Sequence, residues 1–182
     1  MKEHEAGLAS RSVQVVRSAV WELVTTLLPA LLIALSINVF AAEASVVDGP
    51  SMQPNLYGGY RVVAEKISYH LHPPRRGDVV IAERPGNEGS LIKRVVALPG
   101  ETVEVRGGHV LINGQRIEEP WVRNFGGPNH PPTVVPADHV FILGDNRVNS
   151  RDSRAIGPVP VEMIKGRVVL IYWPLDEIKV VP

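Results

Sequence analysis

Twenty consecutive uncharged residues, from Leu23 to Ala42, constrain this chain more than any other stretch. A helix of that length rises about 30 Å, which matches the hydrocarbon core of a bilayer. Trp21 and Phe40 lie near the two ends, where aromatic side chains often occupy the membrane interface. Pro29 inside the run predicts a kink, which membrane helices tolerate. The run therefore predicts one transmembrane anchor.

Two other interpretations of this apolar run are open. A buried core helix would explain the composition, but apolarity on every side is uncommon in a small β-rich domain. A cleaved signal peptide is the second alternative, because residues 42–44 read Ala-Glu-Ala and resemble an A-x-A cleavage site. The apolar region of a signal peptide is usually about 7–15 residues, however, and this run is longer. We therefore favour an anchor that is retained.

The charges beside the run predict its orientation. Lys2, Arg11 and Arg17 precede it, whereas the next basic residue after it is Arg61. Because cytoplasmic flanks carry the excess of basic residues, the N-terminus should be cytoplasmic, and the membrane that we expect is the plasma (inner) membrane. The expected organisation is a cytoplasmic segment at 1–22, the anchor at 23–42 and an extracytoplasmic catalytic domain at 43–182.

The chain beyond the anchor reads as mainly β. Short apolar runs alternate with turn residues between about residues 60 and 174, and the chain holds 16 glycines and 16 prolines. Gly107-Gly108 and Asn113-Gly114 predict two tight turns around a short strand. We interpret the stretch from about 102 to 136 as a small β-ribbon subdomain inserted into the main sheet, with a poorly structured segment at 124–136.

Composition removes several classes of function. The chain balances 19 basic against 19 acidic residues, so no overall charge favours nucleic acid. It has no cysteine, which excludes a thiol nucleophile and cysteine-ligated metal. His70 and His72 could form a metal-binding pair on one strand, but no other ligand spacing supports this, and surface histidines are the better interpretation. We expect no metal and no cofactor.

A serine and a lysine remain as candidates for chemistry. Ser51 lies in the turn sequence GPSMQPNL, shortly after the apolar run, and Lys93 lies in SLIKRVVALPG, a predicted strand. A lysine among apolar neighbours loses hydration, and its pKa falls because the charged form is disfavoured. A neutral amine can take a proton from a serine hydroxyl. From this segment alone, a lysine that extends its ammonium to water is the better interpretation.

Three motifs in a fixed order favour the catalytic interpretation. GPSMQPNL, LIKRVVALPGE and GDNRVNSRDSRAIGPVP follow one another after the apolar run. In this the chain resembles the type I signal peptidases, membrane-bound serine proteases with a Ser-Lys dyad that remove signal peptides from exported proteins. The resemblance extends from Leu31 to about Pro174. It implies a signal-peptidase-like β-sheet or barrel catalytic domain.

The resemblance also assigns roles to individual residues. It implies that Ser51 is the nucleophile, that Lys93 is the general base and that Ser150 orients the lysine amine through a hydrogen bond. Met52 and Ile92 are expected to bind substrate. A polar cluster is expected to support the site, and for its members we favour a turn stabilised by side chains over direct catalysis: Asp145, Arg147, Asp152 and Arg154.

This chain departs from the common family pattern at several positions. Asn55 stands where threonine is usual, and Gly49 stands where many bacterial members have a serine whose hydroxyl completes the oxyanion hole. The expected partners are precursor proteins with signal peptides and the lipid bilayer, with the secretion machinery nearby, and not nucleic acid. A maturation peptidase for pilus or conjugation proteins is a close alternative. A non-catalytic, membrane-tethered β-domain that binds partners is an alternative of another class.

Overall fold

The computed structural model describes residues 17–18, 20–33, 42–84 and 89–181. The chain divides into two units, residues 1–41 and residues 42–182. In the first unit, residues 17–18 and 20–33 are helical, so the described part of the predicted anchor is a helix that includes Pro29. Across the described ranges, no helix is both long and apolar enough to span a bilayer. Residues 34–41 of the predicted anchor lie outside the described residues.

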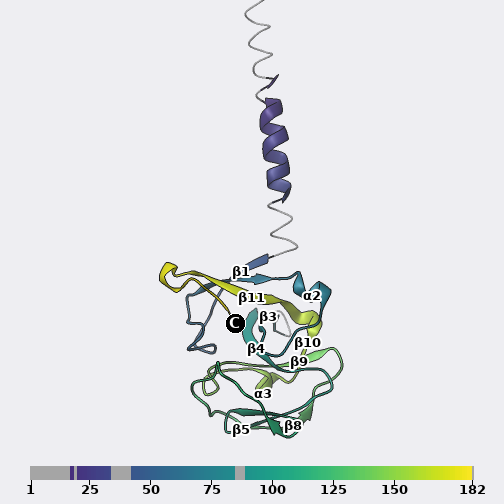
Figure 1. Cartoon of the computed structure of the whole chain (residues 1–182), viewed down its shortest axis with the longest axis vertical. Coiled ribbons are helices and arrows are strands. Elements are labelled where there is room, and N and C mark those ends of the chain that lie inside the picture. The colour runs from purple at the N-terminus through teal and green to yellow at the C-terminus, as the bar shows by residue number, and fades with distance from the viewer. Residues whose placement is uncertain (1–16, 19, 34–41, 85–88, 182) are drawn as a thin grey trace, which may run out of the picture. The chain divides into compact units, whose positions relative to one another are not determined.

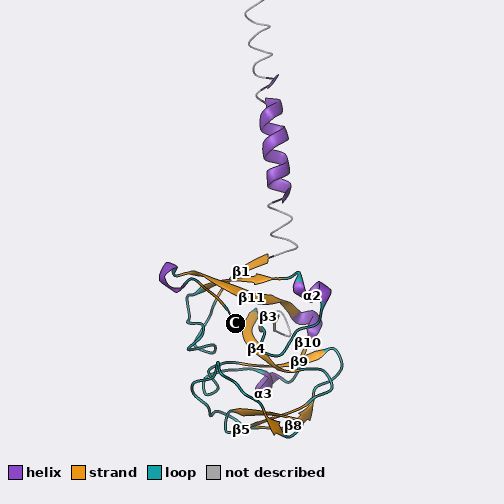
Figure 2. Ribbon diagram, viewed as in Figure 1, coloured by secondary structure: helices purple, strands orange, loops and turns teal. Residues whose placement is uncertain are grey.

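The second unit begins with the last residue of the apolar run, Ala42, which pairs with Glu65. Its elements are β1 (Ala42–Val46), β2 (Arg61–Glu65), α2 (Ser68–Leu71), β3 (Val79–Glu83), β4 (Ser90–Ala97), β5 (Thr102–Arg106), β6 (His109–Ile112), β7 (Gln115–Arg116), β8 (His130–Val134), β9 (His139–Leu143), α3 (Ser153–Ile156), β10 (Val159–Pro160), η2 (Val161–Met163), β11 (Ile164–Trp173), η3 (Leu175–Glu177) and β12 (Lys179–Val180). Figure 2 shows that strands and loops dominate this unit, which confirms the mainly β prediction.

The larger sheet has the strand order β1-β2-β11-β3-β4-β9-β10, with β12 paired to β11 (Figure 1). Its paired strands are antiparallel, and β4 lies between β3 and β9. Every residue of β4 after Ser90 is buried. Antiparallel strands usually expose one face, so burial on both faces means that β4 lies inside the unit. This position matters because β4 carries Lys93.

A second sheet, of order β7-β6-β5-β8, comes from the chain between β4 and β9. The two predicted turns are present: Gly107-Gly108 and Asn113-Gly114 all have positive φ, as tight hairpin turns require. The expectation of a poorly structured segment at 124–136 was wrong, because β8 lies within it and pairs with β5. Pro131 and Pro132 obscured this strand in the sequence, and they are tolerated because β8 is an edge strand.

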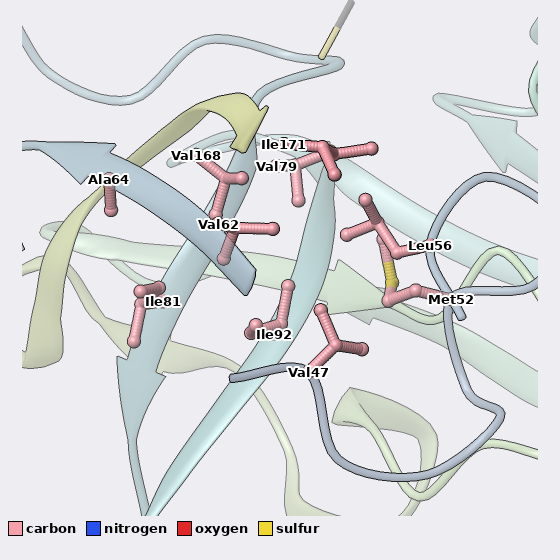
Figure 3. Close-up of a cluster of buried hydrophobic side chains, with 10 residues drawn as sticks. All are labelled: Val47, Met52, Leu56, Val62, Ala64, Val79, Ile81, Ile92, Val168 and Ile171. Carbon is pink, nitrogen blue, oxygen red and sulfur yellow. The ribbon is translucent and has the colours of Figure 1, made fainter. Parts of the chain in front are cut away.

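Apolar side chains between the two sheets join them into one unit. Val96 and Ala97 of β4 share a buried cluster with Val103 of β5, Val110 of β6 and Phe141 of β9. In Figure 1 the second sheet accordingly lies beside β4 and β9. A separate cluster packs under the turn that carries Ser51 (Figure 3), and its members are Val47, Met52, Leu56, Val62, Ala64, Val79, Ile81, Ile92, Val168 and Ile171.

A buried ion pair also ties the second sheet to the larger one. Arg147, after β9, donates through Nη1 and Nη2 to both carboxylate oxygens of Glu119, between β7 and β8. The Arg147 and Glu119 side chains are 0% and 1% exposed. Arg147 also donates to the carbonyl of Gly108 at 2.5 Å, in the turn between β5 and β6. Two charges without access to water are stable only while they remain paired.

We predict that Glu119→Gln lowers the free energy of unfolding by about 3–5 kcal/mol, because it leaves the Arg147 guanidinium buried and uncompensated. Chemical denaturation measures this loss. Glu104→Gln is the matched control: its partner Arg106 is 70% exposed, so that change should cost at most about 1 kcal/mol. Similar small losses in both variants would show that the buried pair does not hold the two sheets together.

Candidate active site

Ser51 lies at the start of a tight turn that two buried side chains fix in place. The amides of Gln53 and Leu56 donate to the carbonyls of Pro50 and Met52 at 3.1 and 2.9 Å. Met52 and Leu56 are each 1% exposed, and they point into the cluster of Figure 3. Because the neighbouring side chains are anchored below, the half-buried Ser51 keeps a defined direction at the edge of the core.

Lys93 reaches this serine from β4. Its Nζ lies 2.8 Å from Ser51 Oγ, across 42 residues of sequence. The same nitrogen donates to the carbonyl of Ile92 at 2.8 Å. The lysine is only 3% exposed, because it lies in a strand that is covered on both faces. The structure thus brings together the two residues that the sequence singled out for chemistry.

Burial lowers the pKa of the Lys93 amine to about 8. Loss of hydration is the largest cause, since it disfavours the charged form. The carboxylates of Asp152 and Asp145 act in the opposite direction, and the Arg84 guanidinium adds to the lowering. A substantial fraction of the amines is therefore neutral near pH 8, and a neutral amine can accept a proton.

Asp145 is held by the residue that follows Lys93. Arg94 donates from Nε and Nη2 to the two carboxylate oxygens, at 2.9 Å each. Both side chains are at most 1% exposed. Asn55 Nδ2 donates to the same carboxylate at 2.7 Å. The two-point contact from Arg94 fixes the position and orientation of the Asp145 carboxylate.

Asp152 forms the second carboxylate site. Arg154 donates to it from Nε and Nη2 at 2.8 Å each, and the Gly144 amide donates at 3.0 Å. Asp152 also caps α3, because its side chain accepts from the Arg154 amide. Burial by itself would raise the pKa of Asp152, but these hydrogen bonds and the Arg154 charge hold the pKa below its ordinary value. Asp152 therefore stays ionised near Lys93.

The loop after β9 supports the serine turn from the other side. The Asn146 amide donates to the Ser51 carbonyl at 3.0 Å, and Asn146 Nδ2 donates to the Pro50 carbonyl at 3.2 Å. Gly144 permits this approach. A Cβ at Gly144 would lie 2.3 Å from Ser150 Oγ and 2.5 Å from the Ser51 carbonyl oxygen. Backbone contacts, rather than side-chain packing alone, thus set the position of Ser51.

Three further predicted residues, Ser150, Met52 and Ile92, are buried near the site. Ser150 Oγ is buried, and within the described residues the expected hydrogen bond to Lys93 is not formed; the Ser150 hydroxyl instead helps to lower the pKa of Asp152. Met52 was expected to bind substrate, but its side chain lies in the core, since at this place in the turn it points inward. Ile92, also expected to bind substrate, is 9% exposed in the same cluster.

The remaining predicted residues frame the site. Asp145, Asp152 and Arg154 make the contacts described above, whereas Arg147 joins the two sheets. His70 lies in the short helix α2 rather than in a strand. Within the described ranges, no group of three or more histidine, aspartate or glutamate residues is placed to hold a metal ion.

Sequence reasoning missed three residues that organise the site: Arg94, Asn55 and Glu119. Arg94 carried a signal, because a second basic residue inside an apolar strand needs a buried partner. Asn55 departs from the family pattern, but nothing in the sequence indicated its partner, and Glu119 carried no signal, because the partners of Glu119 and Asn55 lie 28 and 90 residues away.

A serine hydroxyl beside a buried amine of lowered pKa is the arrangement found in serine hydrolases that use a Ser-Lys pair. Comparison with known proteins gives the particular family. Residues 20–173 match the family described as signal peptidase, peptidase S26. The chain is 43% identical over 169 residues to signal peptidase I of Leptolyngbya laminosa, covering 88% of this chain and 83% of that protein.

Two further relatives agree with this match. Probable signal peptidase I-1 of Synechocystis sp. is 40% identical over 161 residues, which cover 84% of this chain and 82% of that protein. Signal peptidase I of Bacillus amyloliquefaciens is 31% identical over 191 residues, covering 98% of both chains. The chain therefore belongs to the signal peptidase family, peptidase S26. It is a serine endopeptidase that cleaves signal peptides.

We predict that Gly144→Ala lowers kcat by about 10-fold or more, because an added Cβ must displace Ser150 or the Ser51 carbonyl. Steady-state kinetics on a precursor measures this loss. Gly100→Ala is the control for steric contact: nothing lies within 4 Å of the added Cβ, so although its φ of +81° makes the variant less stable, kcat of the folded enzyme should stay near that of the wild type. An unchanged kcat in Gly144→Ala would contradict the role of this close contact.

Proposed function

We propose that Ser51 is the nucleophile and Lys93 the general base of this signal peptidase. The observation that carries the proposal is the 2.8 Å distance between Ser51 Oγ and the buried Lys93 amine. A neutral amine has two N–H groups and one lone pair. One N–H is directed at the Ile92 carbonyl, which leaves the lone pair to accept the Ser51 proton.

The reaction then proceeds in two halves. Ser51 Oγ forms a bond to the scissile carbonyl carbon while Lys93 takes the hydroxyl proton. The C–N bond breaks, and Lys93 returns the proton to the leaving amine. A water molecule next attacks the ester, with Lys93 again as the base, which releases the new carboxyl group and restores Ser51.

The backbone N–H of Ser51 is the proposed donor to the oxyanion of the tetrahedral intermediate. Among the described residues, no group accepts a hydrogen bond from it. Gly49 supplies no hydroxyl, and its φ of +74° is a conformation that residues with side chains rarely adopt. A serine at this position would therefore be strained in the present turn, so we assign oxyanion stabilisation to the backbone.

The proposed substrates are exported precursors with small residues at positions −1 and −3 of the cleavage site. We propose that residues 23–42 anchor the enzyme in the plasma membrane with its N-terminus in the cytoplasm, and that 102–136 act as an inserted subdomain. The apolar run and the basic residues before it support this orientation. Secretion machinery would deliver the substrate nearby, and the cleavage segment would bind as an added strand, since main-chain hydrogen bonds hold peptides of varied sequence.

Substitution of either dyad residue tests the proposal. Ser51→Ala and Lys93→Ala should each lower kcat for a precursor in detergent micelles by about 10³-fold or more. Lys93→Arg should fail equally, because a guanidinium stays protonated and cannot act as a base. Lys165→Ala is the control, because this partly exposed lysine pairs with Glu83. Near-normal processing by any of the three dyad variants would refute the assignment.

The pH dependence of kcat/KM gives an independent test. Since Lys93 acts in its neutral form, activity should rise about tenfold per pH unit and level off near its pKa, which burial lowers to about 8. A profile that levels off near pH 6.5, the ordinary pKa of histidine, would assign the base to another residue. A rise that continues to pH 10.5, the ordinary pKa of lysine, would show that Lys93 is hydrated.

A further inference from the structure

We propose that Asn55 is a positioning residue for catalysis: its amide joins the Asp145 carboxylate to the Trp121 carbonyl and so fixes the loop that holds Ser51. This inference rests on the proposed roles of Ser51 and Lys93. It adds a residue in which the chain departs from the common pattern of its family.

The contacts of the Asn55 amide are short and specific. Nδ2 lies 2.7 Å from Asp145 Oδ2 and 2.8 Å from the carbonyl oxygen of Trp121. An amide nitrogen carries two hydrogens, so it can donate one to each acceptor. The carboxylate has no access to water, because the Asp145 side chain is 0% exposed. Loss of the Asn55 amide would leave the buried Asp145 carboxylate with one hydrogen bond fewer, which costs free energy because water cannot replace the donor.

Asp145 is the point where the segments that carry the two reacting groups meet. Arg94 donates two hydrogen bonds to the Asp145 carboxylate, and it is adjacent to Lys93 in the chain. Asn146, the next residue in the chain, donates its backbone N–H to the Ser51 carbonyl. A shift of Asp145 therefore moves the support of Ser51 relative to Lys93.

Trp121 brings the second sheet into the same network. It lies between β7 and β8, and its ring lies 4.7 Å from the Arg94 guanidinium, a distance at which a cation and an aromatic face attract. The Trp121 ring also lies against Gly77, since a Cβ added there would be 4.0 Å from ring atoms Cη2 and Cζ3. With its ring against Arg94 and its carbonyl bound to Asn55, Trp121 closes the network around Asp145.

The number of donors that a side chain offers makes the proposal testable. Leucine has the same number and branching of side-chain heavy atoms as asparagine and offers no donor. A threonine hydroxyl offers one proton and can serve only one of the two acceptors. Activity should therefore decrease in the order wild type, Asn55→Thr, Asn55→Leu. Asn124→Leu is the control, since Asn124 is an exposed asparagine between β7 and β8, in the segment that also carries Trp121.

The experiment measures kcat and KM on a precursor in detergent micelles, together with thermal unfolding of each full-length variant. Asn55→Leu should lower kcat about 10- to 100-fold, and Asn55→Thr about 3- to 10-fold, as expected from the loss of two or one buried hydrogen bonds. KM should stay within about threefold of the wild type, because the amide faces protein groups and not substrate.

A pH profile separates positioning from a purely structural role. The charge of Asp145 raises the pKa of Lys93 against the effect of burial. If Asn55 no longer holds Asp145, the Asp145 charge raises the pKa of Lys93 less. The rise of kcat/KM with pH that reflects deprotonation of Lys93 should then move to lower pH in Asn55→Leu. A variant that is only less stable would unfold earlier but would keep the wild-type profile while folded.

The outcomes are distinct. An unchanged kcat in Asn55→Leu, with Ser51→Ala inactive, would overturn this inference and leave the dyad intact. A loss matched by Asn124→Leu, or an unshifted pH limb, would also overturn it. If Asn55→Leu does not fold, Asn55→Thr gives the result: a kcat equal to that of the wild type would contradict the need for both hydrogen bonds.

Discussion

The burial of the Lys93 amine beside Ser51 is the constraint on which the rest of this structure depends. A lysine in water has a pKa too high to act as a base at ordinary pH, and only the loss of hydration corrects this. Strand β4 provides the dry environment because it is covered on both faces, which an edge or surface strand could not do. The arrangement of the two sheets around β4 therefore serves the chemistry as well as stability.

The carboxylates near this amine balance the effect of burial. Asp152 and Asp145 both raise the pKa of Lys93, so without them the amine would be a weaker base. Each carboxylate is paired with an arginine, Arg154 and Arg94 respectively, which fixes it in position. These ion pairs are costly to bury, and they persist because each is satisfied by further hydrogen bonds. The same loop that carries them also holds the Ser51 turn through Asn146.

The sequence predicted the parts of this account that depend on local pattern. The strands around Val79 and Lys93 and the tight turns at 107–108 and 113–114 follow from alternation and from glycine, and the structure confirms them. The Ser51 and Lys93 pairing followed from motif order, and the two side chains do meet. The prolines of β8 argued against a strand there, because proline is tolerated only in an edge strand and the sequence does not show which strands lie at an edge.

Long-range contacts set the limit of prediction. The packing of the two sheets determines the partners of Asn55 and Glu119, and no spacing in the sequence predicts these contacts. Met52 turned inward because the turn places it above a core that only the folded chain creates. Ser150 lacks the expected hydrogen bond to Lys93 for a related reason. The direction of its side chain depends on how several backbone segments pack together.

Direct titration of the Lys93 amine tests the central claim most closely. The nitrogen or adjacent carbon chemical shift of Lys93, followed by NMR in the folded catalytic unit of the full chain, reports its protonation without reference to activity. The account predicts a midpoint near pH 8, to which burial lowers the pKa of this amine. A midpoint near 10.5, the ordinary pKa of a hydrated lysine, would contradict it.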